Sequence, residues 1–172
     1  MSKGRILIVD DSNIQSAIFK DVLIKEGYSV LTAGNGREGI EVARKEQPDV
    51  IVTDLHMPVM DGFEMIKRMR QDESTKHVPI ICVTATYQDI ESKISTLTEA
   101  GADEYFYSPA NPQEFIAKVI VMMRIRKVYL DLLEKNRQLK IFNDAAVDRE
   151  TKMIELKDRI KELESQLAKK GI

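Results

Sequence analysis

The chain has 172 residues, 31% of them charged and 43% apolar, which suits a globular protein with one full-sized core and an additional segment. Its apolar runs are too short to span a membrane, and the N-terminus lacks the apolar stretch of a signal peptide. We therefore expect a cytoplasmic protein without a membrane partner. The single cysteine, Cys82, lies in an apolar run and is predicted to be a buried thiol rather than a nucleophile or a metal ligand.

The net charge differs between two parts of the chain. Residues 1–123 contain 13 lysines and arginines against 19 aspartates and glutamates, whereas residues 124–172 contain 13 against 9. The basic residues of the second part are interleaved with acids and come without a zinc-ligand pattern or a series of aromatic residues. This pattern indicates a solvated helix face, so no nucleic-acid partner is expected.

Strand and helix signals alternate through residues 1–123. Short apolar runs predict strands at 5–9, at 28–33, at 50–54, at 80–83 with Thr84 at its end, and at 104–107. Helices are predicted after a cap at Ser12 or Asn13, near 37–45, 64–70 and 89–99, and from Asn111 onward. The core side of the first helix is expected to contain Ile14, Ala17, Ile18, Val22 and Leu23. The alternation predicts an α/β fold, a five-stranded parallel doubly wound sheet with helices on both faces.

Polar residues follow the ends of these strands: Asp10 and Asp11, Asp54, Thr84 and Ser108. In such sheets ligands bind at the carboxyl ends of the strands. Carboxylates about 4 Å apart repel by about 4 kcal/mol at an effective dielectric near 20, and a bound cation removes this conflict. The all-oxygen set favours Mg²⁺. A carboxylate beside Mg²⁺ is suited to attack a phosphoryl group, which makes Asp54 the candidate acceptor and Thr84 a candidate hydroxyl donor.

These residues resemble the CheY-like receiver domain of bacterial two-component response regulators. The resemblance covers roughly residues 3–125 and rests on four motifs in order, IVDDS at 8–12, DLHMPVMDG at 54–62, VTA at 83–85 and GADEY at 101–105. It implies a flavodoxin-like domain that accepts a phosphoryl group from a sensor histidine kinase or a phosphotransfer protein. It also implies no enzymatic activity beyond catalysis of its own phosphorylation and dephosphorylation.

The resemblance further implies roles for single residues. Asp54 would be the phosphoacceptor; Asp11, Asp54 and the backbone carbonyl of His56 would bind Mg²⁺, with Asp10 assisting through water. Thr84 and Tyr105 would form the switch pair that responds to the phosphoryl group.

One position departs from the family pattern, because Ser108 stands where these domains have a lysine that pairs with the phosphoryl group. Serine donates a hydrogen bond but has no charge. Two hypotheses remain open. The chain is either a phosphorylatable but atypical receiver, which the other site residues favour, or a pseudo-receiver that acts as a dimeric scaffold without phosphorylation.

A glycine motif competes with this interpretation. Gly34, Gly36 and Gly39 match G-x-G-x-x-G after a predicted strand, with Asp54 twenty residues after Gly34, as in dinucleotide-binding domains. A sheet of five strands without a substrate domain, and the unexplained acids, argue against this reading. Turn formation and the start of a helix explain these glycines better.

Residues 124–170 form a second region, predicted to be a coiled-coil helix continuous with the fifth helix of a receiver domain at 1–123. Seven apolar residues recur at a spacing of seven, in the order Ile125, Leu132, Leu139, Ala146, Met153, Ile160 and Leu167. Four of the seven residues at the companion d position are apolar: Val128, Phe142, Leu156 and Leu163. We expect a parallel homodimer through this seam, with signalling from Asp54 through the coil. Lys135 and Arg149 at d positions weaken the middle of the seam, and whether the helix breaks near Asn143 is left open. The alternative to a coiled coil is a solvated single helix.

Overall fold

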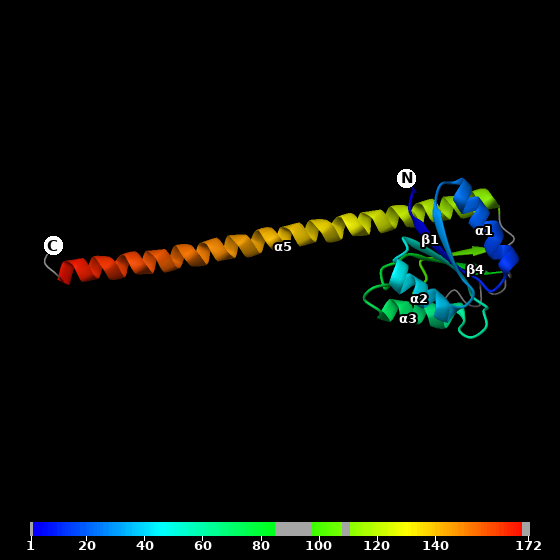
Figure 1. Ribbon diagram of the computed structural model, residues 1–172, viewed down its shortest axis with the longest axis horizontal. Helices are drawn as coiled ribbons and strands as arrows, with labels where there is room; N and C mark the ends of the chain where they lie inside the picture. Colours follow the sequence, from blue (N-terminus) through cyan, green and yellow to red (C-terminus); the bar gives the residue numbers. More distant parts are fainter. Residues whose placement is uncertain (1, 85–97, 108–110, 170–172) are drawn as a thin grey trace. The chain divides into compact units, whose positions relative to one another are not determined.

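The computed structural model describes residues 2–84, 98–107 and 111–169 (Figure 1). The helix predicted near 89–99 lies outside the described residues except at its end, where residues 98–100 are helical. The chain forms two compact units, Met1–Val128 and Tyr129–Ile172. The domain boundary expected after residue 123 stays a prediction. Among the described residues, none of the helices combines the length and apolarity needed to cross a membrane.

The first unit is built on a parallel sheet of five strands. They are β1 (Arg5–Val9), β2 (Ser29–Ala33), β3 (Val50–Asp54), β4 (Ile80–Thr84) and β5 (Glu104–Tyr107). Their order in the sheet is β2-β1-β3-β4-β5, and every neighbouring pair is parallel. The predicted doubly wound sheet is therefore confirmed. The point where the strand order reverses lies between β1 and β3, which is where ligands bind in this kind of sheet.

The described helices are α1 (Asn13–Lys25), α2 (Gly36–Glu46), α3 (Gly62–Gln71) and α5 (Pro112–Lys169). At the start of each helix, the side-chain oxygen of the residue before it accepts a hydrogen bond from a backbone N–H of the first turn. The accepting residues are Ser12, Asn35, Asp61 and Asn111, respectively. Such caps satisfy amides that have no partner within the helix. They also determine where each helix begins after its strand.

Apolar side chains alternate along the strands and form two cores, one on each face of the sheet. Leu7, Ile51 and Ile80 point to the face covered by α2 and α3. Ile6, Val52 and Ile81 and their neighbours point to the other face, where they pack with residues of α1 and α5. Central strands buried on both faces explain why the sequence shows continuous apolar runs there.

An aromatic cluster joins three elements on the α1 and α5 face. Phe19 of α1 lies 4.6 Å from Phe115 of α5 and 6.5 Å from Phe106 of β5, measured between ring centroids. The prediction for the core side of α1 was partly wrong. Phe19 and Leu23 are buried, whereas Ile14 is 77% exposed and Ile18 is 57% exposed. The ring of Phe19 packs against Phe106 and Phe115 over the sheet, while Ile14 and Ile18 lie at the surface.

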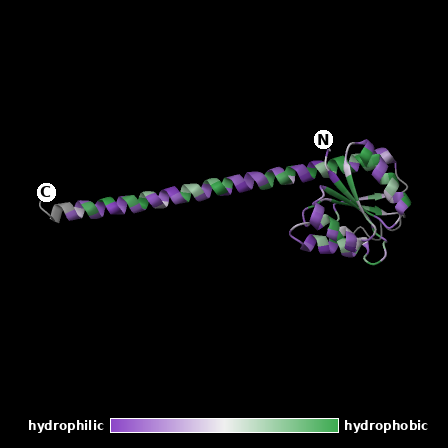
Figure 2. Ribbon diagram, viewed as in Figure 1, coloured by the Kyte–Doolittle hydropathy of each residue, from purple (hydrophilic) through white to green (hydrophobic). Residues whose placement is uncertain are grey.

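Helix α5 is continuous from Pro112 to Lys169, so the chain does not break at Asn143. Phe115, Val119 and Met122 on its first turns are buried in the core of the first unit. In the second unit, polar and apolar residues alternate along the length of the helix (Figure 2). The described side chains from residue 130 to 166 are all exposed.

The burial of α1 can be tested with two neighbouring residues. Phe19→Ala removes a buried ring and should lower the free energy of unfolding by about 3–5 kcal/mol. Ile18→Ala, the matched control, should change it by less than about 0.5 kcal/mol because the side chain is largely exposed. Urea denaturation followed by tyrosine fluorescence measures both. Equal losses would show that the orientation of α1 is different.

Candidate functional site

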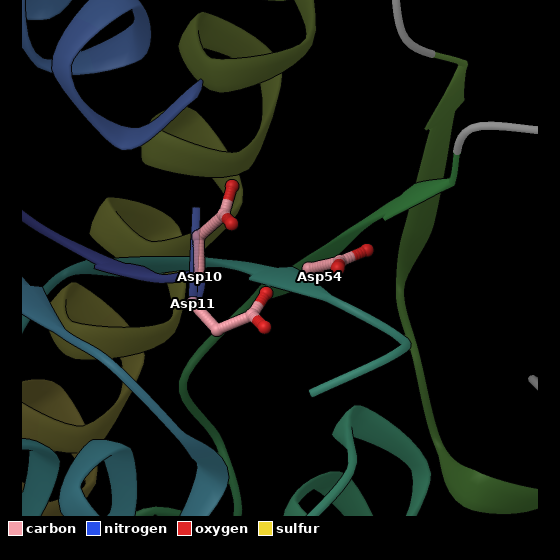
Figure 3. Close-up of side chains that lie close together, drawn as sticks. All are labelled: Asp10, Asp11 and Asp54. Carbon is pink, nitrogen blue, oxygen red and sulfur yellow. The ribbon is translucent and has the colours of Figure 1, made fainter. Parts of the chain in front are cut away.

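Three carboxylates meet at the carboxyl ends of β1 and β3. Asp10 and Asp11 follow β1 directly, and Asp54 is the last residue of β3. One oxygen of each lies within 4.8 Å of the others (Figure 3). Asp10 is buried, Asp54 is partly buried and Asp11 is exposed. Adjacent pairing of β1 with β3, in which Val9 lies beside Thr53, brings the three acids together.

Burial works against the charge of two of these acids. Desolvation raises the pKa of Asp10 from 3.8 to about 6, against the opposing effect of the Ser12 amide, which donates to Oδ1 at 2.8 Å. Desolvation also raises the pKa of Asp54, opposed by the backbone amides of Leu55 and His56. The charges of neighbouring acids add to both increases. A cation at this point would therefore relieve an unfavourable electrostatic arrangement.

The donor set fits a hard divalent ion. It consists of carboxylate oxygens only, from one buried, one half-buried and one exposed residue, and so leaves a side open to water. Mg²⁺ is usually bound by one or two carboxylates while keeping several waters. Asp10, Asp11 and Asp54 thus form an acidic cluster of the composition expected for a magnesium site.

The loop after Asp54 is tightly packed under the site. A Cβ atom at Gly62 would lie 2.3 Å from the carbonyl oxygen of Asp54, so only glycine fits there. Val59 has a φ of 70°, and the Met60 amide donates to the Pro58 carbonyl at 2.8 Å, which makes a γ-turn. This conformation is rare and strained for a β-branched residue. No residue pattern in the sequence predicted the strain at Val59.

The other predicted site residues have different positions. Thr84 is buried at the end of β4, one residue beyond Val83, which pairs with Asp54. Tyr105 lies on β5 and is 40% exposed. The backbone amide of His56 contributes to holding the Asp54 carboxylate, whereas metal binding by its carbonyl stays a prediction. Ser108 lies outside the described residues.

The glycine motif serves packing in this fold. The Gly36 amide donates to the Met60 carbonyl at 3.1 Å, and a Cβ at Gly36 would lie 2.8 Å from the same oxygen. A Cβ at Gly39 would meet the Met65 sulfur and the Val9 side chain at 2.9–3.0 Å. The two glycines therefore let α2 approach β1 and α3 closely.

Comparison with known proteins identifies the class that this fold and site define. Residues 6–120 match the model of the response regulator receiver domain family. The chain belongs to this family. The predicted resemblance is thereby confirmed, and phosphorylation-based signalling is the function of the class.

The chain is similar to several members in particular. It is 38% identical over 120 residues to the DNA-binding dual master transcriptional regulator RpaA of Synechocystis, a match covering 70% of this chain and 49% of that protein. The chain thus spans about half the length of this curated relative. Among solved structures, a putative response regulator from Chloroflexus aurantiacus has a TM-score of 0.67 and 36% identity, with 70% of this chain and 98% of that one covered.

A second solved structure concerns the metal. The receiver domain of a sensor histidine kinase from Pseudomonas aeruginosa, with a magnesium ion coordinated in its active-site cleft, has a TM-score of 0.63 and 25% identity; 72% of this chain and 98% of that one are covered. RpaA is a DNA-binding transcriptional regulator. The expectation that this chain has no nucleic-acid partner is therefore not supported by the comparisons.

The raised pKa of Asp10 predicts a pH dependence of stability. Between about pH 4 and 6, folded protein holds a proton that the unfolded chain releases, so the Asp10 contribution to the free energy of unfolding falls as the pH rises. Without divalent cations, Asp10→Asn should therefore gain stability relative to the unmutated protein from pH 4 to 7. Urea denaturation across this range measures the difference. Added Mg²⁺ should stabilise the unmutated protein more than the variant, and a difference that is constant with pH would contradict the prediction.

Proposed function

We propose that this protein is a response regulator in which Asp54 accepts a phosphoryl group from a histidine kinase or a phosphotransfer protein. The observation that supports this most directly is the cluster of Asp10, Asp11 and Asp54 at the switch point of the sheet. As the phosphoryl group transfers, its P–N bond to the donor histidine breaks and a P–O bond to the Asp54 carboxylate forms. The cytoplasm remains the proposed location, and no further enzymatic activity is proposed.

The side chains around Asp54 have separate tasks in this proposal. The Leu55 amide donates to Asp54 Oδ1 at 2.8 Å and fixes the orientation of the nucleophile. Asp10 and Asp11, with Asp54 and the His56 carbonyl, would hold Mg²⁺, which when bound supplies positive charge for the phosphoryl oxygens. Thr84 would donate its hydroxyl to the phosphoryl group, and Tyr105 would respond on the neighbouring strand.

An exposed apolar surface lies close to the acids. Ile14 and Ile18 are one turn apart on α1 and exposed, and α1 begins two residues after Asp11. Exposed apolar residues next to a reactive group are typical of protein contacts. We propose that the kinase or phosphotransfer protein binds over these isoleucines.

The start of α5 is well placed to receive a signal from β5. Lys118 forms an ion pair with Glu104 at 3.2 Å, and Phe115 packs 5.4 Å from Phe106. Arg126 of α5 donates to the His77 carbonyl at 3.2 Å. A rearrangement of β5 around Tyr105 would therefore act on the helix that continues into the second unit.

We further propose that two copies associate through the apolar seam of α5. Within the described part of the second unit, the seam residues Leu132, Leu139, Met153, Leu156, Ile160 and Leu163 are exposed, and Leu167 continues their sequence pattern. An exposed apolar stripe at this spacing is what a coiled coil buries. Ile125, within the first unit, is exposed as well and extends the series.

Phosphorylation of Asp54 can be measured directly. With acetyl phosphate and Mg²⁺, intact-mass spectrometry should show the addition of one phosphoryl group. Asp54→Ala should show none, because the acceptor oxygen is lost. A lack of mass gain in the unmutated protein would contradict the phosphorylatable receiver and leave the pseudo-receiver hypothesis.

Ser108 provides a second comparison. A lysine there would add a charge-assisted hydrogen bond to the phosphoryl group, worth about 1.5–3 kcal/mol. Ser108→Lys should therefore raise the phosphorylated fraction or its lifetime. An unchanged value for both would show that the serine does not limit the reaction.

The seam can be tested with two adjacent leucines of similar exposure. Leu132→Asp places a charge in the seam, whereas Leu133→Asp, the matched control, lies outside it. Losing one buried leucine per chain costs about 2–5 kcal/mol each, so the dimer dissociation constant should rise at least about a hundredfold for the first variant only. Sedimentation velocity at several concentrations measures this. A monomer at every concentration of the unmutated protein would exclude the dimer.

A further inference from the structure

Two basic residues interrupt the apolar seam of α5. Between Tyr129 and Lys169 the a and d positions are apolar except for Lys135 and Arg149, and both are exposed. In a parallel pair in register, each residue faces its own copy. Lys135 would then face a second Lys135 and Arg149 a second Arg149 across the core, which places like charges together in two layers.

We infer that two copies of α5 pair in antiparallel orientation, in the register that places Leu132 of one copy opposite Leu156 of the other. In this register the residue numbers of each facing core pair add up to 288. This inference rests on the proposed dimer and replaces the parallel order expected from the sequence. In this register every a position faces a d position. The four central layers pair Leu132 with Leu156, Leu139 with Arg149, Phe142 with Ala146, and Lys135 with Met153.

This register removes the pairing of like charges in the core. Lys135 and Arg149 each face an apolar side chain, over which their aliphatic stems lie while the charged ends reach water. The largest and smallest side chains of the middle, Phe142 and Ala146, face each other twice by symmetry. Their combined volume fills the layer, whereas parallel pairing would place two alanines together. Both residues of this layer lie within α5, which runs through residues 142–146 without a break.

Charges beside the seam also favour the antiparallel order. In a parallel coil, Lys152 lies next to Lys157 of the second copy, which offsets the attraction of Arg159 for Glu164. In the antiparallel register, residues at equal heptad positions lie side by side. Asp131 then faces Arg159, twice by symmetry, and no like charges are paired at the flanks. Arg159 also pairs with Glu162 of its own chain, and a guanidinium has donors for both carboxylates.

The orientation has a consequence for signalling. The residues where each helix leaves its receiver unit come at opposite ends of an antiparallel coil. Leu132 of one copy lies beside Leu156 of the other, 24 residues away, or about 36 Å at 1.5 Å per residue. The phosphorylation state of one Asp54 would therefore act on its own helix, and not through contact of two receivers held side by side.

Cysteine cross-linking of the full chain tests the inference. Leu132→Cys alone should give no disulfide-linked dimer under mild oxidation, because the two thiols would be about 36 Å apart and a disulfide needs Cα atoms within about 7 Å. An equal mixture of Leu132→Cys and Leu156→Cys proteins, unfolded and refolded together in reducing buffer and only then oxidised, should give a linked heterodimer. Cys82 is buried, and burial raises the pKa of its thiol to about 12, so it should not interfere.

The outcomes separate the inference from the proposed dimer. A linked dimer from Leu132→Cys alone would overturn the antiparallel order and leave the dimer intact. Absence of links in the mixture, with a dimer present in sedimentation, would overturn this register. A monomer in sedimentation would overturn the dimer itself.

Spin labels provide an independent measurement without a covalent link. Leu130 lies on the outer side of the coil, and one label there should give a distance of about 40 Å or more in an antiparallel pair. A parallel pair should give about 20 Å, set by the width of two helices. The shorter distance alone would overturn the inference.

Discussion

The site depends on the burial that the fold imposes on a cluster of three carboxylates. Parallel pairing of β1 with β3 leaves Asp10, Asp11 and Asp54 within 4.8 Å of one another, and desolvation raises the pKa of two of them. The rest of the sheet supports this unfavourable arrangement with two apolar cores. Under the proposed function, a cation, or a phosphoryl group together with its cation, would offset this unfavourable arrangement when it binds.

The loop that follows β3 is tightly packed beneath these three carboxylates. Gly62 lies against the Asp54 carbonyl, and the Gly36 amide donates to the Met60 carbonyl, so the backbone below the acids has little freedom. Strain at Val59 is tolerated because neighbouring contacts determine the turn. The Asp54 carboxylate is therefore held in place by the backbone amides of Leu55 and His56.

Helix α5 connects two different environments. Its first turns are buried beside Phe19 and Phe106, where aromatic packing and the pair of Lys118 with Glu104 tie it to β5. Beyond Val128 its described side chains are exposed, apart from the partly buried Tyr129, and in the single chain they form an apolar seam without a covering surface. Two basic residues, Lys135 and Arg149, occupy core positions of this seam, and in the proposed dimer they favour the antiparallel order.

The sequence by itself determined the strands, their parallel arrangement and the acids at their ends, because apolar periodicity and turn residues are local signals that leave few topologies. It also indicated the long helix through its seven-residue repeat. Only the tertiary structure decided which side of α1 is buried, since Phe19 packs against Phe106 and Phe115 while the isoleucines remain exposed. It likewise decided the closeness of the carboxylates and the strain at Val59, because these depend on contacts between residues distant in the chain. The continuity of α5 through Asn143 also came only from the structure, because it depends on the helix as a whole.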